Sequence, residues 1–226
     1  MDRGGVFDSS ALTSESGVFS VQPDHAALQR ARQQMQRSVA VRVKARMHAR
    51  FAHAQSELQA LLPPTFAAGD SYSVLSNGDI DALSYVRHIM THEQFAAVVF
   101  ACWAISRPAI EFLAEQHDRG HLQRVDAYVG EIMPRDRPAL HTMLCDLVRR
   151  TGGRVVAMRN HAKVWMFLGA RRAAVVMQTS ANPNYNRRIE QTCIQRSAAI
   201  ARAYKTAFDA IDLPTPNFPS WTPYAW

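Results

Sequence analysis

A histidine and a lysine interrupt an apolar stretch in the second half of the chain. His161 and Lys163 open the segment HAKVWMFL, and residues two apart in a β-strand point to the same side of a sheet. This spacing places an imidazole and an ammonium side by side at one end of a strand. Burying both is costly unless an anion lies between them, so the pair indicates an anion site. The alternative is an edge strand that leaves both side chains in water.

Polar side chains also follow the next apolar stretch, AAVVMQTS. Ser180 and Asn182 keep the same two-residue spacing, so a hydroxyl and an amide that can donate to an anion share a face where this strand ends. Glu190 is the only carboxylate between Leu147 and Phe208. It could orient a catalytic group or pair with a neighbouring arginine, and the spacing leaves both roles open.

The order of these residues resembles the signature of the phospholipase D superfamily. That signature is HxK, then a GSxN-like segment and a later Glu, matched here by His161-Ala162-Lys163, Thr179-Ser180-Ala181-Asn182 and Glu190. The sequence contains no second HxK, which is similar to the single-motif bacterial and phage-type nucleases of that superfamily, in which two chains build one site. Two positions depart from the fuller signature: Leu168 stands where HxKxxxxD has Asp, and Thr179 stands where GSxN has Gly.

The resemblance implies a metal-independent phosphodiesterase that needs no cofactor and acts as a homodimer. His161 would attack phosphorus to form a phosphohistidine, while His161 of a second subunit would protonate the leaving oxygen. Lys163 and Asn182 would bind the non-bridging oxygens, with Ser180 in support. Glu190 would hold an imidazole in its working tautomer.

The formal net charge of +7 favours a polyanionic partner, and nucleic acid is expected before an anionic membrane surface. The predicted function is therefore a nuclease that acts on DNA or RNA. Candidate nucleic-acid-binding residues are Arg171, Arg172, Arg187, Arg188 and Trp165. Solvated turns are the alternative for the arginines, and core packing is the alternative for the tryptophan.

Two other functions remain open from the sequence. A protein that keeps the fold and the phosphate pocket but binds nucleic acid without cleaving it is consistent with Leu168. Hydrolysis of a lipid or its headgroup is the third possibility. The sequence lacks an amphipathic segment rich in Trp or Phe on one face, so no stable membrane association is expected.

Strand and helix patterns alternate from about Ser71 to Ile211 and predict an α/β sandwich with a mixed sheet flanked by helices, similar to the phospholipase D fold. The expected strands are QFAAVVFACWAI, RVDAYVGEI, GRVVAM, HAKVWMFL and AAVVMQTS. Helices are expected from Asp79 to Met90, between Ser106 and Gly120, between Pro138 and Gly152, and from Ala198 to Ile211.

Composition divides the chain into four parts. We expect a flexible arm over 1–24, a basic helical extension over 25–64, a phospholipase D-like domain over 65–213 and a Pro/Trp-rich tail over 214–226 that its aromatics pack as a strap. The extension carries Lys and Arg but no acid between Arg30 and Arg50. That pattern fits a solvated or packing helix as well as a phosphate-binding one.

Cysteine and histidine usage gives no sign of a metal site. Cys102, Cys145 and Cys193 are far apart without CxxC spacing, which favours a reducing cytoplasm over a disulfide framework or structural zinc. The N-terminus has no apolar secretory segment, and the run from Phe95 to Ile105 is too short to span a bilayer. Pairs of histidines four apart, His88/His92 and His117/His121, lack an obvious third ligand, so no metal is expected.

Overall fold

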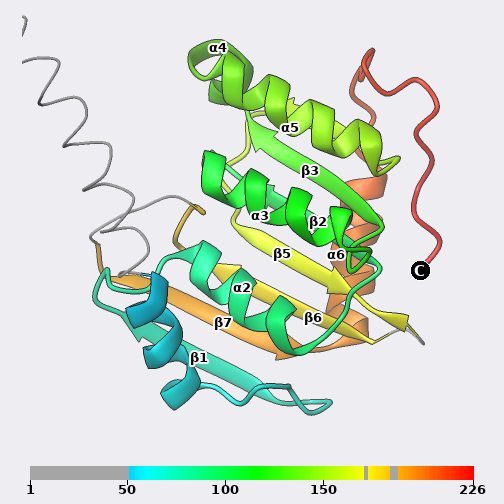
Figure 1. The fold of residues 1–226 in the computed structure, drawn as a ribbon. Coiled ribbons are helices and arrows are strands. Elements are labelled where there is room, and N and C mark those ends of the chain that lie inside the picture. Colours follow the sequence, from blue (N-terminus) through cyan, green and yellow to red (C-terminus); the bar gives the residue numbers. More distant parts are fainter. Residues whose placement is uncertain (1–50, 171–172, 184–187) are drawn as a thin grey trace, which may run out of the picture. The chain divides into compact units, whose positions relative to one another are not determined.

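Strands from the whole length of the described chain form one mixed sheet (Figure 1). The computed structural model describes residues 51–170, 173–183 and 188–226. In chain order the strands are β1 (Ser71–Ser76), β2 (Ala97–Cys102), β3 (Arg124–Gly130), β4 (Val155–Met158), β5 (Val164–Leu168), β6 (Ala174–Thr179) and β7 (Glu190–Arg196). The seven strands lie in the order β1-β7-β6-β5-β2-β3-β4. β2, β3 and β4 run parallel and the other pairings are antiparallel, so the predicted mixed sheet is confirmed.

Helices cover both faces of this sheet. They are α2 (Ala82–His92), α3 (Arg107–Asp118), α4 (Ile132–Asp136), α5 (Pro138–Arg150) and α6 (Ala198–Asp209), preceded by a helix over residues 51–61. Figure 1 shows α2, α3 and α5 on one face and α6 on the other. The alternation of side chains along β5 explains the two layers, because Trp165 and Phe167 enter the core with α2 and α3, whereas Met166 and Leu168 enter the core with α6. The predicted α/β sandwich is confirmed.

Proline, serine and glycine set the limits of two predicted helices. Ser106 is the N-cap of α3, and Pro108 lies in its first turn. Pro138 begins α5. Gly120 and Gly152 follow these helices with φ of 75° and 68°, a left-handed conformation that glycine adopts without a steric penalty. Both helices therefore begin and end where the sequence indicates.

Three elements were not predicted from the sequence: β1, β7 and the short helix α4. The two strands pair with each other at one border of the sheet, and their sequences, SYSVLS and EQTCIQR, alternate polar residues with few apolar ones. Their inward side chains, such as Val74 and Ile194, join the larger core. Because only alternate side chains are buried, these strands lack the continuous apolar run that marks the central strands.

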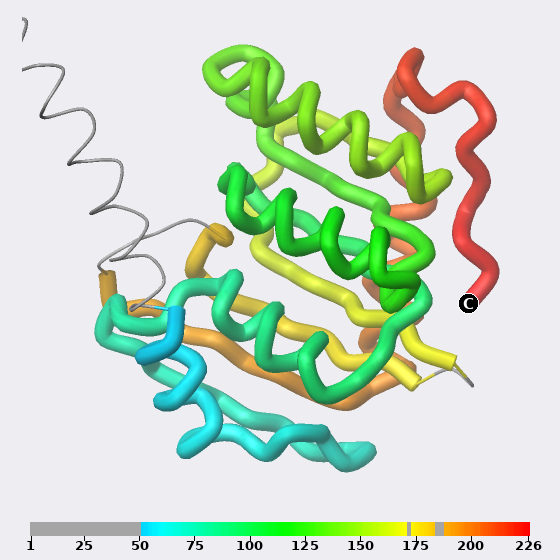
Figure 2. Tube along the Cα trace, in the orientation of Figure 1, coloured from blue at the N-terminus to red at the C-terminus, as the bar shows by residue number. Residues whose placement is uncertain are grey.

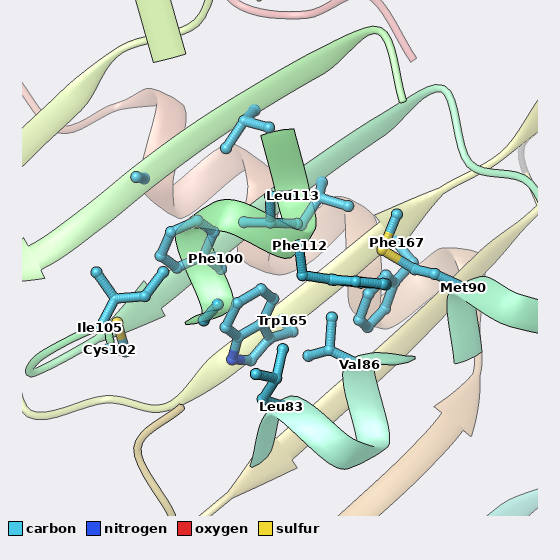
Figure 3. Close-up of a cluster of buried hydrophobic side chains, with 14 of the residues drawn as sticks. Leu83, Val86, Met90, Phe100, Cys102, Ile105, Phe112, Leu113, Trp165 and Phe167 are labelled. Atoms are coloured by element: carbon cyan, nitrogen blue, oxygen red, sulfur yellow. The ribbon is translucent and has the colours of Figure 1, made fainter. Parts of the chain in front are cut away.

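The core beneath α2 and α3 is built around aromatic rings (Figure 3). Trp165 is fully buried and stacks on Phe100 with ring centres 4.4 Å apart. Leu83 and Val86 of α2 lie beside it in Figure 3. Trp165 is therefore a core residue, and its predicted contact with nucleic acid is wrong, because no face of the indole reaches solvent.

The C-terminal tail runs beside the rest of the described domain (Figure 2), and its tryptophans make the contacts. The indole Nε1 of Trp221 donates to Asp126 Oδ1 at 2.8 Å, and the guanidinium carbon of Arg154 lies 3.6 Å from the centre of a Trp221 ring. Trp226 Nε1 donates to the carbonyl oxygen of Gly169 at 3.0 Å. These contacts bind the tail to β3 and to the residue that follows β5.

The predicted arm over 1–24 and most of the basic extension lie outside the described residues. The described part of the extension is helical over 51–61 and ends before Pro63, as the sequence indicates. In the part of the chain that the structure describes, no helix has the length and apolar character needed to cross a membrane.

Candidate phosphate-binding site

The candidate residues gather where several strands end, which we call the polar end of the sheet. Strand registers define it: Ser76 at the end of β1 pairs with Glu190 at the start of β7, and Thr179 at the end of β6 pairs with Thr192. Val164, the first residue of β5, pairs with Gln178 of β6. The antiparallel pairings therefore bring residues that are far apart in the sequence to the polar end of the sheet.

The connection between β4 and β5 positions the histidine. β3 and β2 lie between these two strands, so five residues must cross the ends of both. Asn160 stabilises this crossing segment. Its Nδ2 donates to Tyr128 O of β3 at 2.8 Å and to Cys102 O of β2 at 3.3 Å. Its Oδ1 accepts from Ala162 N at 2.9 Å. The strand predicted to begin at His161 therefore begins at Val164, because the preceding residues are used for the crossing.

His161 and Lys163 lie together at this end, but in the crossing segment before β5, whereas their spacing predicted one face of a strand. The imidazole is exposed, whereas the lysine is buried. Lys163 Nζ lies 3.3 Å from His161 Nδ1 and donates to the carbonyl oxygen of His161 at 2.9 Å. When the ammonium donates to Nδ1, a neutral imidazole carries its proton on Nε2. An attack by Nε2 requires the other tautomer, in which Nε2 has lost its proton and Nδ1 carries one. The ammonium must then move to another acceptor, and a phosphate oxygen is such an acceptor.

Burial controls the charge state of Lys163. Loss of solvation lowers the pKa of the ammonium, and the negative charges of Cys102, if ionised, and of Glu190 act in the opposite direction. Burial also raises the pKa of the Cys102 thiol far above its usual range, which keeps that thiol neutral. The protonated lysine is thus poorly solvated, and an anion beside it would favour its charged form.

Glu190 and Ser180 form the second part of the site. The buried carboxylate of Glu190 accepts a hydrogen bond from Ser180 Oγ. Ser180 Oγ in turn accepts from Gln191 N at 3.0 Å, and Ser180 N donates to Gln191 O at 2.9 Å. Ser180 therefore holds the carboxylate in the field of Lys163, a role that its spacing in the sequence did not indicate.

Asn182 is oriented by the loop that follows β2. Its Oδ1 accepts from the backbone nitrogens of Trp103 at 3.2 Å and Ala104 at 3.4 Å. These bonds use the acceptor of the amide, so Nδ2 is the group that can donate to a ligand. The ring of Trp103 lies 6.1 Å from the ring of His161, centre to centre, so the residue whose backbone binds Asn182 also has its ring beside His161.

Thr179 joins β6 to β7 beneath the site. Its Oγ1 lies 2.8 Å from Thr192 Oγ1 and accepts from Ala181 N at 3.1 Å, while its backbone nitrogen donates to Lys163 O at 3.0 Å. The hydroxyl of Thr179 thus stabilises the turn that leads to Asn182. A glycine could not make these two side-chain contacts, so Thr179 supports this turn by a different means.

Leu168 lies at the opposite end of β5 from His161. It is fully buried and pairs with Ala97 of β2 and Ala174 of β6. The surrounding cluster is apolar and includes Val99, Met166 and Val176. The strand alone, from Val164 to Leu168, spans roughly 13 Å, and His161 lies before its other end. Leu168, which stands where HxKxxxxD has Asp, therefore belongs to the core of the domain. It adds no side chain to the polar end.

The structure brings together five of the predicted site residues and leaves others apart: His161, Lys163, Ser180, Asn182 and Glu190 gather at the polar end. Arg188 is exposed just before β7. Arg171, Arg172 and Arg187 lie outside the described residues. Trp165 belongs to the core.

The paired histidines make structural contacts. His88 Nε2 lies 3.0 Å from Pro63 O, and His117 Nδ1 lies 2.9 Å from Leu122 O. His121 Nδ1 lies 3.3 Å from Gln116 Oε1. Within the described ranges, no group of three or more His, Cys, Asp or Glu side chains gathers as a metal site would require.

Two residues of this site were not identified from the sequence. Asn160 looked like part of a short connection, and its polarity directly before HAK was the available signal. Trp103 lies inside the apolar run from Phe95 to Ile105, which was predicted as one strand, so nothing in the sequence distinguishes it from a core residue. Only the strand order shows that Asn160 bonds to β2 and β3 and that the ring of Trp103 lies beside His161.

Comparisons with known proteins add similarities of fold. No family model matches the chain, and no curated protein matches it. Among solved structures, Nuc from Salmonella typhimurium, a phospholipase D family member, is similar with a TM-score of 0.47 and 14% identity, covering 62% of this chain and 91% of that one. Phosphatidylserine synthase from Haemophilus influenzae has a TM-score of 0.47 and 11% identity, over 62% of this chain and 37% of that one.

A polyphosphate kinase from Porphyromonas gingivalis is also similar, with a TM-score of 0.49 and 17% identity over 65% of this chain. The match spans only 27% of the kinase. These similarities concern the arrangement of strands and helices, and the chemistry of the site has to be derived from the residues of this chain.

Proposed function

We propose that the protein is a metal-independent phosphodiesterase, a nuclease whose site is completed by a second copy of the chain. The observation that supports this most directly is the exposed imidazole of His161, whose Nδ1 lies 3.3 Å from the buried ammonium of Lys163. Asn182 binds the backbone of Trp103, whose ring lies beside that of His161, and Glu190, which accepts from Ser180, acts on the charge of Lys163. The group combines a nucleophile with donors for phosphate oxygens, as the resemblance of the motif to phospholipase D implies.

The reaction takes place in two steps. Nε2 of His161 attacks phosphorus, a P–N bond forms, and the P–O bond to the leaving group breaks as His161 of the second copy protonates the leaving oxygen. Water, deprotonated by that second imidazole, then attacks phosphorus and breaks the P–N bond, which releases a phosphomonoester. Lys163 and Asn182 hold the non-bridging oxygens, and Lys163 leaves Nδ1 to do so. The two imidazoles must begin in different protonation states, which a shared phosphate enforces.

Exposed apolar side chains at the polar end support pairing of two copies. Leu75 is 74% exposed and Ile189 is 68% exposed, and they directly precede Ser76 and Glu190, which pair across β1 and β7. Large apolar side chains left in water near a site that holds one HxK favour a partner surface there. A two-fold axis at this end would bring the two His161 side chains to one phosphate.

The direct test incubates the purified protein and His161→Ala with labelled single- and double-stranded DNA and RNA in EDTA. We expect cleavage by the wild type and a loss on the order of a thousandfold in the variant. Cleavage retained by His161→Ala would exclude it as the nucleophile. Salt-sensitive binding without cleavage would support a nucleic-acid-binding protein that has lost turnover, and hydrolysis of lipid vesicles alone would support a lipid substrate.

A mixing experiment tests whether the site is shared. Wild-type chains are unfolded and refolded with an excess of His161→Ala chains, so that most wild-type chains form mixed dimers. If two copies supply one site, activity per wild-type chain falls steeply, because each mixed dimer has one of the two imidazoles. Unchanged activity per wild-type chain would show that each copy acts alone. Refolding with an excess of Asn217→Ala, an exposed asparagine of the C-terminal tail, is the matched control.

A further inference from the structure

Trp103 is a large aromatic residue placed in water directly after a buried strand. The six residues of β2 are all buried, but the indole that follows them is 38% exposed. An exposed tryptophan in the neighbourhood of a site is typical of a contact surface for a ligand or partner.

The indole is held in place before any ligand arrives. The backbone nitrogen of Trp103 donates to Asn182 Oδ1 at 3.2 Å, and the carbonyl oxygen of Trp103 accepts from Gly130 N at 3.1 Å. The ring lies so close to Gly130 that a Cβ at that position would lie 2.6 Å from its Cδ1. Glycine at 130 is therefore what lets the indole lie across the end of β3, and a fixed ring loses little entropy when it binds.

The position of this ring relative to His161 suggests what it binds. The two ring centres are 6.1 Å apart, with a tilt of 48° between the planes, so the rings do not stack on each other. In a nucleotide, the base is one sugar away from the phosphate. A phosphate at His161 therefore places the neighbouring base within reach of the indole face.

We propose that Trp103 stacks on the base next to the scissile phosphate and that the substrate is single-stranded nucleic acid. This inference rests on the proposed function. Stacking on an aromatic ring accepts any base, but the base has to be unstacked from its neighbours, which a duplex prevents. The cationic Lys163 and the donor Asn182 bind the backbone, and Trp103 adds affinity that depends on the base alone.

The test uses single-stranded dinucleotides with one phosphodiester bond, intact or lacking a base on one side. Stacking contributes about 1–3 kcal/mol per base, so Trp103→Leu should lower kcat/KM for the intact dinucleotide roughly ten- to hundredfold. The same variant should treat the intact and base-free substrates alike, whereas the wild type prefers the intact one. Trp103→Phe keeps an aromatic face and should retain most of this preference. Leu213→Ala, which removes a 41% exposed apolar side chain elsewhere, is the control.

Binding separates this inference from the catalytic proposal. In an inactive His161→Ala background, Trp103→Leu should weaken binding of a single-stranded oligonucleotide by a similar factor, measured by fluorescence anisotropy at fixed salt. This readout does not depend on which residue is the nucleophile. A wild type that makes no distinction between intact and base-free dinucleotides, or that prefers a duplex to a single strand, would overturn the inference. A Trp103→Leu protein that is no longer dimeric in sedimentation would also overturn it, since the indole would then be part of the subunit interface.

Discussion

The two ends of β5 carry opposite chemistry within five residues of strand. At its start, Lys163 reaches His161 and lies in the field of Glu190. At its other end, Leu168 is enclosed by alanines of β2 and β6. One end therefore presents donors to a ligand, and the other stabilises the fold by excluding water.

This difference shows which departures from the phospholipase D signature bear on the proposed reaction. Leu168 occupies the position of the signature Asp, but it lies in the apolar cluster with Val99 and Val176. Thr179 replaces a glycine at the polar end, and there it bonds to Thr192 and Ala181. Whether a substitution in the motif affects the reaction therefore depends on whether the fold places that residue at the polar end or in the core.

His161→Ala should separate function from stability most clearly. We expect kcat to fall roughly a thousandfold, about 4 kcal/mol in the barrier, because the variant lacks the nucleophile. The side chain is exposed, so the free energy of unfolding in urea should change by less than about 0.5 kcal/mol. A large loss of stability in this variant would show that the histidine is part of the core of the polar end.

Leu168→Asp, which restores the acid of the signature, should have the reverse effect. An unpaired carboxylate in this apolar cluster should lower the free energy of unfolding by about 3 kcal/mol or more. Leu168→Ala, which leaves a cavity, should cost about 2–5 kcal/mol. Neither variant should raise kcat of the folded fraction. An increase in kcat for Leu168→Asp would contradict the separation of the two ends.

Asn160→Ala should act on both properties at once. It removes the hydrogen bonds to Tyr128, Cys102 and Ala162, and each buried group left without a partner costs about 1–3 kcal/mol. Because the crossing segment then moves, kcat should fall more than KM rises, on the order of tenfold to a hundredfold. The exposed Asn217 of the C-terminal tail offers a control substitution to Ala. Full activity in Asn160→Ala would show that the crossing segment holds its shape without this side chain.

The affinity for inorganic sulfate should depend on pH through Lys163. Burial lowers the pKa of this ammonium, so the free site loses its charge at a lower pH than an exposed lysine would. A bound anion favours the protonated form and raises the pKa, so binding takes up a proton and weakens as the pH rises. The charge of sulfate stays constant over this range, and calorimetry at several pH values measures the change.

Lys163→Arg provides the comparison for that measurement. The guanidinium stays charged, so the affinity of this variant should be nearly independent of pH over the range in which a lysine loses its charge. If the affinity of the wild type for sulfate stays constant until the pH reaches the usual pKa of lysine, burial does not lower the pKa of Lys163.

Much of the fold could be predicted because its signals are local. The apolar runs of β2, β5 and β6 identify the central strands, and Pro138 and Gly152 identify the limits of α5. β1 and β7 could not be predicted in this way, since the evidence for a strand with one exposed face lies mainly in the partner that it pairs with. Trp165 was assigned to a ligand surface because spacing shows which side of a strand a residue faces, but not what covers that side.

The sequence by itself determined the chemistry that is available: an imidazole, an ammonium, a hydroxyl, an amide and one carboxylate, in an order that resembles the phospholipase D signature. It also determined the apolar strands that carry them. The tertiary structure alone decided which of these groups meet. Strand order makes the segment before β5 cross β3 and β2, so Asn160 bonds to both strands, Trp103 comes to lie beside His161, and Leu168 is placed at the other end of β5. Residue types set what a side chain can do, whereas long-range pairing of strands sets what it can reach.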